Sequence, residues 1–459
     1  MLARAGARVT LIERDALSSD GPARDAFAWE RKGIPHFLQP HAFTPRGRNE
    51  LRTHMPDVYE TLLREGADEI DMWPRIPGGR PAGEDDMIYL AIRRPFIEWA
   101  LRHAVQAEAS IHVVGPARAV GITFEGRVTG LRLDDGSTFA CDLVIDAMGR
   151  TSSMQAWLEA HGVKMPAPTS AECGSLYYSR YYRLRPGRAF PDGPWLVSPR
   201  AELGYAGCAT FYGDDRTFAT AFFVPTQDAD LRIIRDARAY DAVLANIPVI
   251  SSLVDPEMAE PITGVLPMGN LQNTYRTYAV DGEPIVAGVI PVADAICHTN
   301  PAFALGLSLS VAHAGTLGRI ITEHPNDVRD AAAAFFAASE PEMIERHAMA
   351  TELDAVRARM MRGEKIDPTT PKDSAAMFVA FATGILALKD AEIGRRALRR
   401  WGFLDPLSAI DGDEVFMARL QTEISAFMQG QPPAARGPAR EELLQAARAA
   451  VGSAEPPKG

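Results

Sequence analysis

Cysteine is scarce in this sequence, and the few cysteines follow no metal-binding or disulfide spacing. Structural zinc sites and disulfide-stapled domains need regular spacings, such as paired Cys-x-x-Cys. The four cysteines are instead scattered through 459 residues, at Cys141, Cys173, Cys208 and Cys297. This pattern argues against both classes, and we expect no metal site. Scattered cysteines in a long chain are also typical of a reducing compartment, so we expect a cytoplasmic protein.

Long apolar runs and an excess of positive charge are also missing. The amino-terminal stretch has no apolar core of signal-peptide length and carries Arg4 and Arg8. Asp294 and Pro301 interrupt the best membrane candidate, residues 284–317, well short of a spanning length. Acidic residues outnumber basic ones by 59 to 48, for a formal net charge of −11. We therefore expect neither a membrane span nor a nucleic-acid partner.

The composition that is present is that of a large globular protein. Hydrophobic residues make up 46% and charged residues 23% of the chain. At about 150 residues per domain, the length predicts two or three domains. The first part alternates β-branched and amphipathic stretches, which predicts mixed α and β structure. The expected elements are a helix end over 1–5 closed by Gly6, helices over 46–65 and 95–108, and strands over 8–13, 111–114, 117–124, 128–133 and 143–146.

Composition changes twice further along the chain. Residues 175–278 hold short aromatic and β-branched runs separated by Gly, Pro and Asp, which predicts an antiparallel sheet with one helical insert over 229–247. Residues 325–429 are rich in Ala, Arg, Glu and Met and predict helices. A Pro/Gly linker over 431–437 and a short helix over 439–451 are expected to follow.

The first candidate motif is a helix end, a tight turn and a short strand that finishes on Glu13. In a nucleotide-binding βαβ unit, the acidic side chain at the end of the second strand accepts hydrogen bonds from the ribose hydroxyls. We therefore take Glu13 as a candidate ribose ligand. A surface glutamate at a strand end would give the same local pattern.

The second candidate motif follows the apolar strand over 143–146, which ends at Asp146. Gly149 allows the backbone to come close to a ligand before a helix begins near Ser153. A strand-to-helix turn with a structural capping serine would look similar, so both interpretations remain open at this point.

The third candidate motif lies in residues 293–308. An apolar strand ends at Asp294, a loop with Asn300 and Pro301 follows, and Gly306 opens a helix over 307–320. The positive end of that helix, with its unpaired N–H groups, can hold a phosphate or the negative charge of a reduced cofactor ring. A buried helix with a capping loop is the alternative.

In their order and spacing the three motifs resemble one family, the FAD-dependent monooxygenases related to p-hydroxybenzoate hydroxylase and to flavin halogenases. The family's middle motif is Asp-Ala-Ser-Gly-Arg-x-Ser, and residues 146–152 are Asp-Ala-Met-Gly-Arg-Thr-Ser. Its late motif is Gly-Asp-Ala followed by Asn-Pro-x-x-Gly-x-Gly, which residues 293–295 and 300–306 resemble. Residues 94–98, Arg-Pro-Phe-Ile-Glu, resemble the family's helix start. The likeness covers roughly residues 1–320.

The resemblance implies a cofactor role for each matching residue. Glu13 would bind the ribose of FAD, and Arg94 would face the flavin nucleotide. Asp294 would hydrogen-bond the ribityl or pyrophosphate part. Asp146 and Gly149 would shape the surroundings of the diphosphate or of the nicotinamide.

The resemblance also implies residues around the flavin ring. Gly306 and Leu307, at the helix start, would lie under the pyrimidine edge of the ring and favour its anionic reduced form. Pro301 would line the ring near the site of oxygen attack, and with His298 it is a candidate catalytic residue. The candidate substrate contacts are His41, Tyr178 and Tyr182. Solvated or core-packing roles are the alternatives for these side chains.

The fold implied by the resemblance is α/β. It combines an FAD-binding, Rossmann-like domain of the glutathione-reductase type, lacking its first strand, with an antiparallel β-sheet substrate domain and a helical C-terminal region. The expected boundaries place the FAD-binding domain at 1–165 and 279–322, the substrate domain at 166–278, the helical region at 323–430 and a linker with tail at 431–459.

The implied activity is that of an NAD(P)H-dependent monooxygenase of secondary metabolism. NADH or NADPH reduces FAD, O2 adds to the reduced ring as a peroxyflavin, and one oxygen atom hydroxylates or epoxidises a small aromatic or polyketide-like molecule. A flavin-dependent reductase or dehydrogenase of the same fold is one alternative, and a non-enzymatic homologue that has lost FAD is another. Halogenation is not expected, because residues 204–209 do not match the Trp-x-Trp-x-Ile-Pro motif of flavin halogenases.

Three departures from the family's pattern stand out. Ala293 and Ala304 replace two glycines of the late motif. The strand and GxGxxG loop with which the family begins are missing, because Met1 falls inside the expected first helix. Six lysines against 42 arginines indicate a GC-rich coding sequence, in which an internal valine codon is easily read as a start. We therefore expect the natural protein to extend upstream by roughly 20 to 30 residues that carry the strand and loop.

Overall fold

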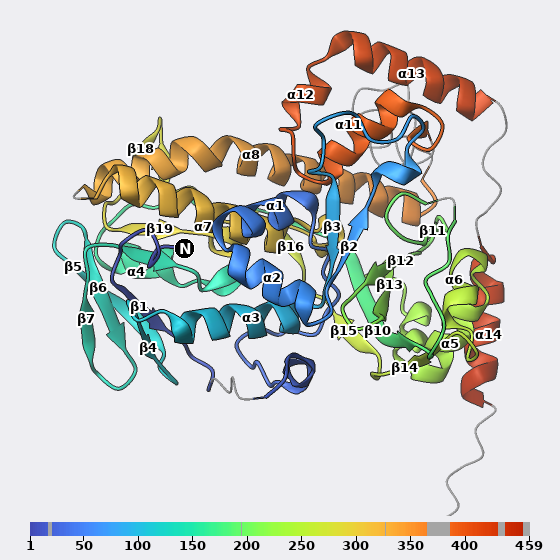
Figure 1. Cartoon of the computed structure of the whole chain (residues 1–459), viewed down its shortest axis with the longest axis horizontal. Helices are drawn as coiled ribbons and strands as arrows, with labels where there is room; N and C mark the ends of the chain where they lie inside the picture. Colours follow the sequence, from blue (N-terminus) through green and yellow to red (C-terminus); the bar gives the residue numbers. More distant parts are fainter. Residues whose placement is uncertain (17–20, 194, 326, 365–385, 430–436, 453–459) are drawn as a thin grey trace, which may run out of the picture.

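The α/β part of the protein contains two separate pairs of parallel strands (Figure 1). The computed structural model describes residues 1–16, 21–193, 195–325, 327–364, 386–429 and 437–452. Strand β1 (Val9–Ile12) pairs with β4 (Ile111–Val114), and β8 (Val144–Asp146) pairs with β19 (Val289–Pro291). The strands expected at these positions are confirmed. Among the described residues β1 pairs with β4 alone, and the upstream strand stays a prediction.

The helix expected over 46–65 consists of two helices, α1 (Pro45–His54) and α2 (Pro56–Arg64). Pro56 has no N–H to donate and its ring crowds the preceding turn, which disfavours one continuous helix here. Met55, between the two, has φ −141° and ψ 59°, outside the helical region. Residues 1–5 form a single hydrogen-bonded turn with the ending expected of a helix closed by Gly6: the N–H of Ala7 donates to Leu2, that of Gly6 to Ala3, and Gly6 has φ 96°.

Antiparallel strands and two helices complete this part of the chain. The helix expected over 95–108 is α3 (Arg94–Ala107), which buries Phe96, Ile97 and Ala100. Strands β2 and β3 pair with each other, and β5, β6 and β7 form a three-stranded antiparallel sheet. The bounds are β2 (Asp68–Asp71), β3 (Ile88–Ala91), β5 (Ala119–Phe124), β6 (Val128–Leu133), β7 (Thr138–Ala140) and α4 (Met154–Ala160).

A larger antiparallel sheet follows, with the strand order β11-β12-β13-β10-β14 and with β15 also paired to β10. It confirms the sheet expected over 175–278. Helices α5, α6 and α14 share a core with one of its faces (Figure 1). Helix α5 begins later than expected, because the Asp236 side chain caps it by accepting from two N–H groups. The bounds are β10 (Ser175–Leu184), β11 (Arg200–Glu202), β12 (Gly207–Tyr212), β13 (Thr217–Pro225), β14 (Ala259–Pro261), β15 (Leu266–Met268), α5 (Ala237–Ala245), α6 (Pro248–Val254) and α14 (Arg440–Gly452).

A short three-stranded sheet, β9-β16-β20, leads into the long helices. Helices α7 and α8 pack against each other (Figure 1). Helices are confirmed over the described part of 325–429, and residues 365–385 of that stretch lie outside the described residues. The bounds are β9 (Thr169–Glu172), β16 (Gln272–Tyr275), β17 (Ala279–Val280), β18 (Glu283–Pro284), β20 (Cys297–His298), α7 (Leu305–Glu323), α8 (Val328–Met361), α11 (Ala391–Trp401), α12 (Ser408–Asp411) and α13 (Glu414–Gln429).

Short 3₁₀ helices fill several connections between these elements. They are η1 (Ala23–Ala28), η2 (Trp73–Arg75), η3 (Gly149–Thr151), η4 (Asp230–Arg235), η5 (Ala293–Ala295) and η6 (Pro301–Phe303). Within the described ranges, no helix combines the length and apolar composition that a membrane crossing requires.

Candidate functional site

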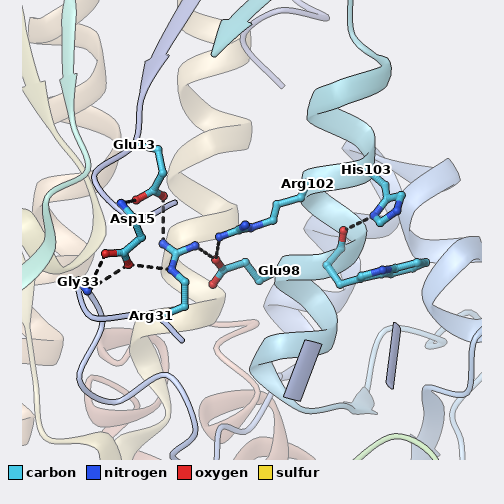
Figure 2. Close-up of polar contacts among 8 residues, drawn as sticks. Glu13, Asp15, Arg31, Gly33, Glu98, Arg102 and His103 are labelled. Atoms are coloured by element: carbon cyan, nitrogen blue, oxygen red, sulfur yellow. Dashed lines mark hydrogen bonds and ion pairs between the residues drawn. The ribbon is translucent and has the colours of Figure 1, made fainter. Parts of the chain in front are cut away.

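One arginine gathers three carboxylates beside the end of β1 (Figure 2). The guanidinium of Arg31 lies 3.0 Å from Glu13 and 3.1 Å from Asp15, and it also pairs with Glu98 from α3. Its side chain is only 7% exposed. Glu13 thus stands at the strand end as predicted, with one oxygen toward Arg31 and the other accepting from the N–H of Asp15 at 2.8 Å. Each carboxylate oxygen keeps a lone pair for a ribose hydroxyl.

The same cluster ties α3 to the loop that follows Arg31 (Figure 2). Glu98 accepts from Arg102 at 2.9 Å, and the N–H of Gly33 lies 3.0 Å from an oxygen of Asp15. Burial raises the pKa of Glu98, and the cation of Arg31 opposes that shift. Arg31 was not predicted, because no periodicity or motif distinguishes a buried arginine in an irregular loop from a solvated one.

Arg94 differs from Arg31 in having no direct counter-ion. It begins α3 as predicted, and within the described part of the chain its guanidinium makes no hydrogen bond or ion pair. Burial lowers the pKa of Arg94, while the more distant carboxylates of Glu98 and Asp294 act in the opposite direction. A partly buried guanidinium without an anion is unfavourable. A phosphate or another anion would supply the missing partner.

Two histidines from the loop over 33–41 lie near Arg94. Burial, reinforced by the Arg94 cation, lowers the pKa of His36 to about 4 and that of His41 to about 3. Nδ1 of His41 donates to the carbonyl of Gln39 at 2.7 Å, which leaves Nε2 as an acceptor. A group with so low a pKa binds few protons near pH 7. His41 can therefore accept a hydrogen bond from a ligand but is a poor general base.

Asp294 and His298 form a close pair at the start of the third motif. Nδ1 of His298 lies 3.3 Å from a carboxylate oxygen of Asp294. Neither ring nitrogen of this buried histidine has a well-aligned hydrogen-bond partner among the described residues. Burial would raise the pKa of Asp294, but the contact with His298 and the nearby Arg94 outweigh it, so the pKa lies below its usual range. With Nδ1 facing Asp294, Nε2 of this imidazole can bind a ligand hydroxyl and hold its proton.

Helix α7 begins against this pair. A Cβ on Gly306 would lie 3.2 Å from an oxygen of Asp294, so a side chain here would push against the carboxylate. No side chain caps the helix. Its first-turn N–H groups, including that of Leu307, therefore offer a positive end to an anion. Pro301 begins η6, the short turn just before α7.

The two alanines that replace family glycines keep a backbone conformation that favours glycine. Ala293 has φ 49° and Ala304 has φ 56°, both in the left-handed region. This conformation costs an alanine about 1 kcal/mol or more. The N–H of Ala293 donates to Nδ1 of His313 on α7 at 3.0 Å, and the N–H of Ala304 donates to the carbonyl of Pro301. These bonds help to hold the loop in place.

Asp146 ends β8 as predicted, but its carboxylate serves the turn itself. One oxygen accepts from the Ser152 hydroxyl at 2.5 Å and the other from the N–H of Met148 at 3.0 Å. Asp146 is 2% exposed. The Asp146 carboxylate therefore stabilises the strand-to-helix turn, which was the alternative to a ligand-binding role. Gly149 has φ 72° and open space where a side chain would begin, so the turn leaves room for a ligand there.

The structure does not bring Tyr178 and Tyr182 to this site. Both rings lie in the apolar core between the large sheet and its covering helices. Tyr177 and Tyr181, the alternate residues of β10, face the other way, and the Tyr177 hydroxyl donates to Asn300 at 2.6 Å. All four residues are tyrosines, so the sequence does not indicate which pair faces the helix-covered core and which pair faces the other side of the sheet.

Comparison with known proteins adds to this picture. No family model matches the sequence. Protein Rv3254 of Mycobacterium tuberculosis (strain ATCC 25618 / H37Rv) is 23% identical over 340 residues, which is 68% of each chain. The solved structure of PqsL, a probable FAD-dependent monooxygenase from Pseudomonas aeruginosa, matches with a TM-score of 0.55 at 15% identity, over 79% of this chain and 93% of that one.

Two halogenases match to a similar degree. The flavin-dependent brominase Bmp2 has a TM-score of 0.58 at 14% identity and covers 94% of this chain and 95% of its own. The myxobacterial chondrochloren halogenase CndH, an FAD-dependent enzyme, has a TM-score of 0.57 at 16% identity, over 88% and 92%. The chain has the fold of FAD-dependent monooxygenases and halogenases. The match with Bmp2 spans almost the whole chain, so this flavoprotein fold is not limited to residues 1–320.

Proposed function

We propose that the protein binds FAD and, with NADH or NADPH as reductant, adds one oxygen atom to a small aromatic or polyketide-like molecule. The observation that carries the proposal is Arg94, a partly buried cation without a direct counter-ion among the described residues. It lies near Asp294, against which the uncapped helix α7 begins. The fold likeness to PqsL supports the same reaction class. Halogenation is not proposed, because residues 204–209 lack the halogenase motif.

The side chains present fit a dinucleotide. Arg94 and the first turn of α7 supply positive charge for a diphosphate or a reduced ring. Glu13, at the end of β1, supplies acceptors for ribose hydroxyls. Gly149 leaves open space at the turn after β8. FAD bound here would supply the redox chemistry.

The protein's own part in the reaction would fall to a few polar groups. His298 would bind a substrate hydroxyl and hold its proton, since both its nitrogens lack good partners, and Asp294 at 3.3 Å would stabilise the resulting positive charge. Nε2 of His41 would accept a second hydrogen bond and orient the substrate. Pro301 and the buried Phe303 would help to exclude water.

Oxygen consumption tests the reaction class. FAD-loaded protein is given NADH or NADPH and a panel of phenols and polyketide aromatics, and O2 uptake is compared with product formed. We expect uptake that rises with a matching substrate and yields oxygenated product. His298→Asn should keep flavin but slow coupled turnover by roughly a hundredfold. Tyr182→Phe, in the core away from the site, is the matched control and should turn over like the wild type.

A different outcome would point to the alternative. If the loaded protein transfers hydride to its substrate under anaerobic conditions and yields no oxygenated product in air, it is a reductase or dehydrogenase. The monooxygenase proposal would then be wrong, although FAD binding would stand.

A further inference from the structure

Helix α8 carries a carboxylate in its buried, largely apolar face. Asp354 is 1% exposed and lies close in sequence to the core residues Ala350, Leu353 and Val356. Burying an ionised carboxylate is unfavourable unless several donors satisfy it. The identity of those donors therefore indicates why an acid stands at this position.

Two asparagines from outside the helix supply the donors. Nδ2 of Asn273, on β16, donates to one oxygen of Asp354 at 2.9 Å. Nδ2 of Asn300, in the loop before α7, donates to the other at 2.8 Å, and Arg357 lies 3.2 Å from the same oxygen. Only an acceptor-only group can serve both amides and a guanidinium at once. An asparagine at 354 would set one N–H2 group against another.

Asn300 is thereby fixed in a single orientation. Its main-chain N–H donates to the side-chain oxygen of Asn273 at 2.7 Å. Its side-chain oxygen accepts from the Tyr177 hydroxyl at 2.6 Å and from the N–H of Ala302 at 3.1 Å. Rotating the amide by half a turn would set its N–H2 group against the N–H of Ala302 and its oxygen against the carboxylate of Asp354. The bond to Asp354 therefore sets the path of the chain into η6 and α7.

Arg357, one turn further along α8, holds the same loop at a second point. Its guanidinium lies over the ring of Phe303, 5.6 Å from the centroid, and over the ring of Phe223 on β13 at 5.4 Å. Phe303 precedes Ala304, whose left-handed φ is unfavourable for alanine. A loop in such a conformation needs external contacts to hold it, and α8 supplies them at Asn300 and at Phe303.

We propose that Asp354, supported by Arg357, is a positioning residue through which α8 holds the Asn300–Ala304 loop in the conformation that receives the flavin ring. This inference rests on the proposed function. Asp354 would touch neither cofactor nor substrate and would act through Asn300. The proposal gives the helical C-terminal region a role, because α8 would connect the loop with β16 and, through Asn300, with β10.

The test measures the loop and the flavin separately. Wild type and Asp354→Asn are compared without flavin by hydrogen exchange at the amides of Asn300 and Ala302, whose acceptors belong to this network. FAD affinity and the circular dichroism of the bound flavin are then measured for both. We expect faster exchange at both amides, an FAD Kd raised about tenfold or more, and a changed flavin spectrum.

A matched control separates positioning from general stability. Phe336→Leu alters a buried residue of α8 in a different core cluster and should lower the melting temperature while leaving exchange at 300–302, FAD affinity and spectrum unchanged. Arg357→Met is a second variant for the case that Asp354→Asn does not fold, since the Arg357 side chain is 16% exposed. It should also raise the Kd for FAD.

The outcomes distinguish the two proposals. If Asp354→Asn folds and shows wild-type exchange, affinity and spectrum, or if Phe336→Leu weakens FAD equally at equal stability, the positioning role is overturned. If the wild type binds no FAD, the proposed function fails, while exchange at Asn300 and Ala302 still decides whether Asp354 anchors the loop.

Discussion

Arg31 lies 3.0 Å from Glu13, the carboxylate expected to bind ribose, and it is also the shared partner of Asp15 and Glu98. One nearly buried cation therefore keeps three carboxylates close to one another without strong repulsion. The position of Glu13 depends on Arg31 as much as on the strand that carries it.

Removing Arg31 should destabilise the folded protein. Arg31→Met leaves three neighbouring carboxylates without their common partner, and loss of one member of a buried ion pair costs about 3–5 kcal/mol. Urea denaturation at pH 7.5 measures this. Arg24→Met, on a side chain 78% exposed, is the control and should denature like the wild type. Equal stability of Arg31→Met and wild type would contradict the structural role.

Arg94 should behave in the opposite way. Because its guanidinium has no partner among the described residues, Arg94→Met should leave the stability of the flavin-free protein unchanged or slightly higher. The same change should raise the Kd for FAD about tenfold or more, since a diphosphate loses its cation. Denaturation and flavin titration on one preparation check both parts. A variant that unfolds easily but binds FAD normally would reverse our assignment.

A buried histidine predicts how stability depends on pH. Burial lowers the pKa of His313 to about 4, against about 6.5 in an unfolded chain. Between these values the unfolded chain holds a proton that the folded chain does not, so stability falls as the pH falls through this window. The loss due to His313 is about 2 kcal/mol from pH 7 to pH 5.

His313→Gln tests this contribution of His313. Urea denaturation at pH 8 gives the packing cost of the substitution, and measurements at pH 7, 6 and 5 give the slope. The variant should lose less stability on acidification than the wild type. His36 and His41 keep part of the slope, because burial lowers the pKa of both as well. Parallel pH profiles for variant and wild type would show that His313 does not contribute.

The left-handed alanine predicts a stabilising substitution. Ala304 has φ 56°, which glycine adopts without steric cost, so Ala304→Gly should raise stability by about 0.5–1 kcal/mol. Ala302→Gly, two residues earlier in η6 and without a positive φ, should lower stability instead. Thermal unfolding of the two variants and the wild type decides the matter, and a destabilised Ala304→Gly would contradict the backbone assignment.

Local patterns predicted much of the fold. The strand over 111–114 has the expected bounds, and the helix expected over 95–108 is shifted by one residue. The helix expected over 46–65 is helical but not continuous: it is divided before Pro56, where Met55 leaves the helical region. These signals lie within a few residues of the feature that they describe.

The candidate site was predicted where a motif carries it, and missed where contacts are remote in sequence. Glu13 and Arg94 stand at element ends as their motifs indicate, whereas the strand expected to end at Asp294 ends at Pro291, and Asp294 lies within η5. Arg31 and Asp354 carry no such mark, since their partners are up to 67 and 81 residues away. Only the folded chain shows that Arg31, in an irregular loop, contacts Glu13 and that Asp354, within an alanine-rich helix, contacts Asn300.

Flavin titration tests the central claim most directly. Purified, flavin-free protein is titrated with FAD by calorimetry, and the visible spectrum of the bound flavin is recorded. We predict saturable binding of one FAD per chain, weakened by Arg94→Met and unaffected by Tyr182→Phe. A folded protein that takes up no FAD, or binds it equally well without Arg94, would contradict the account.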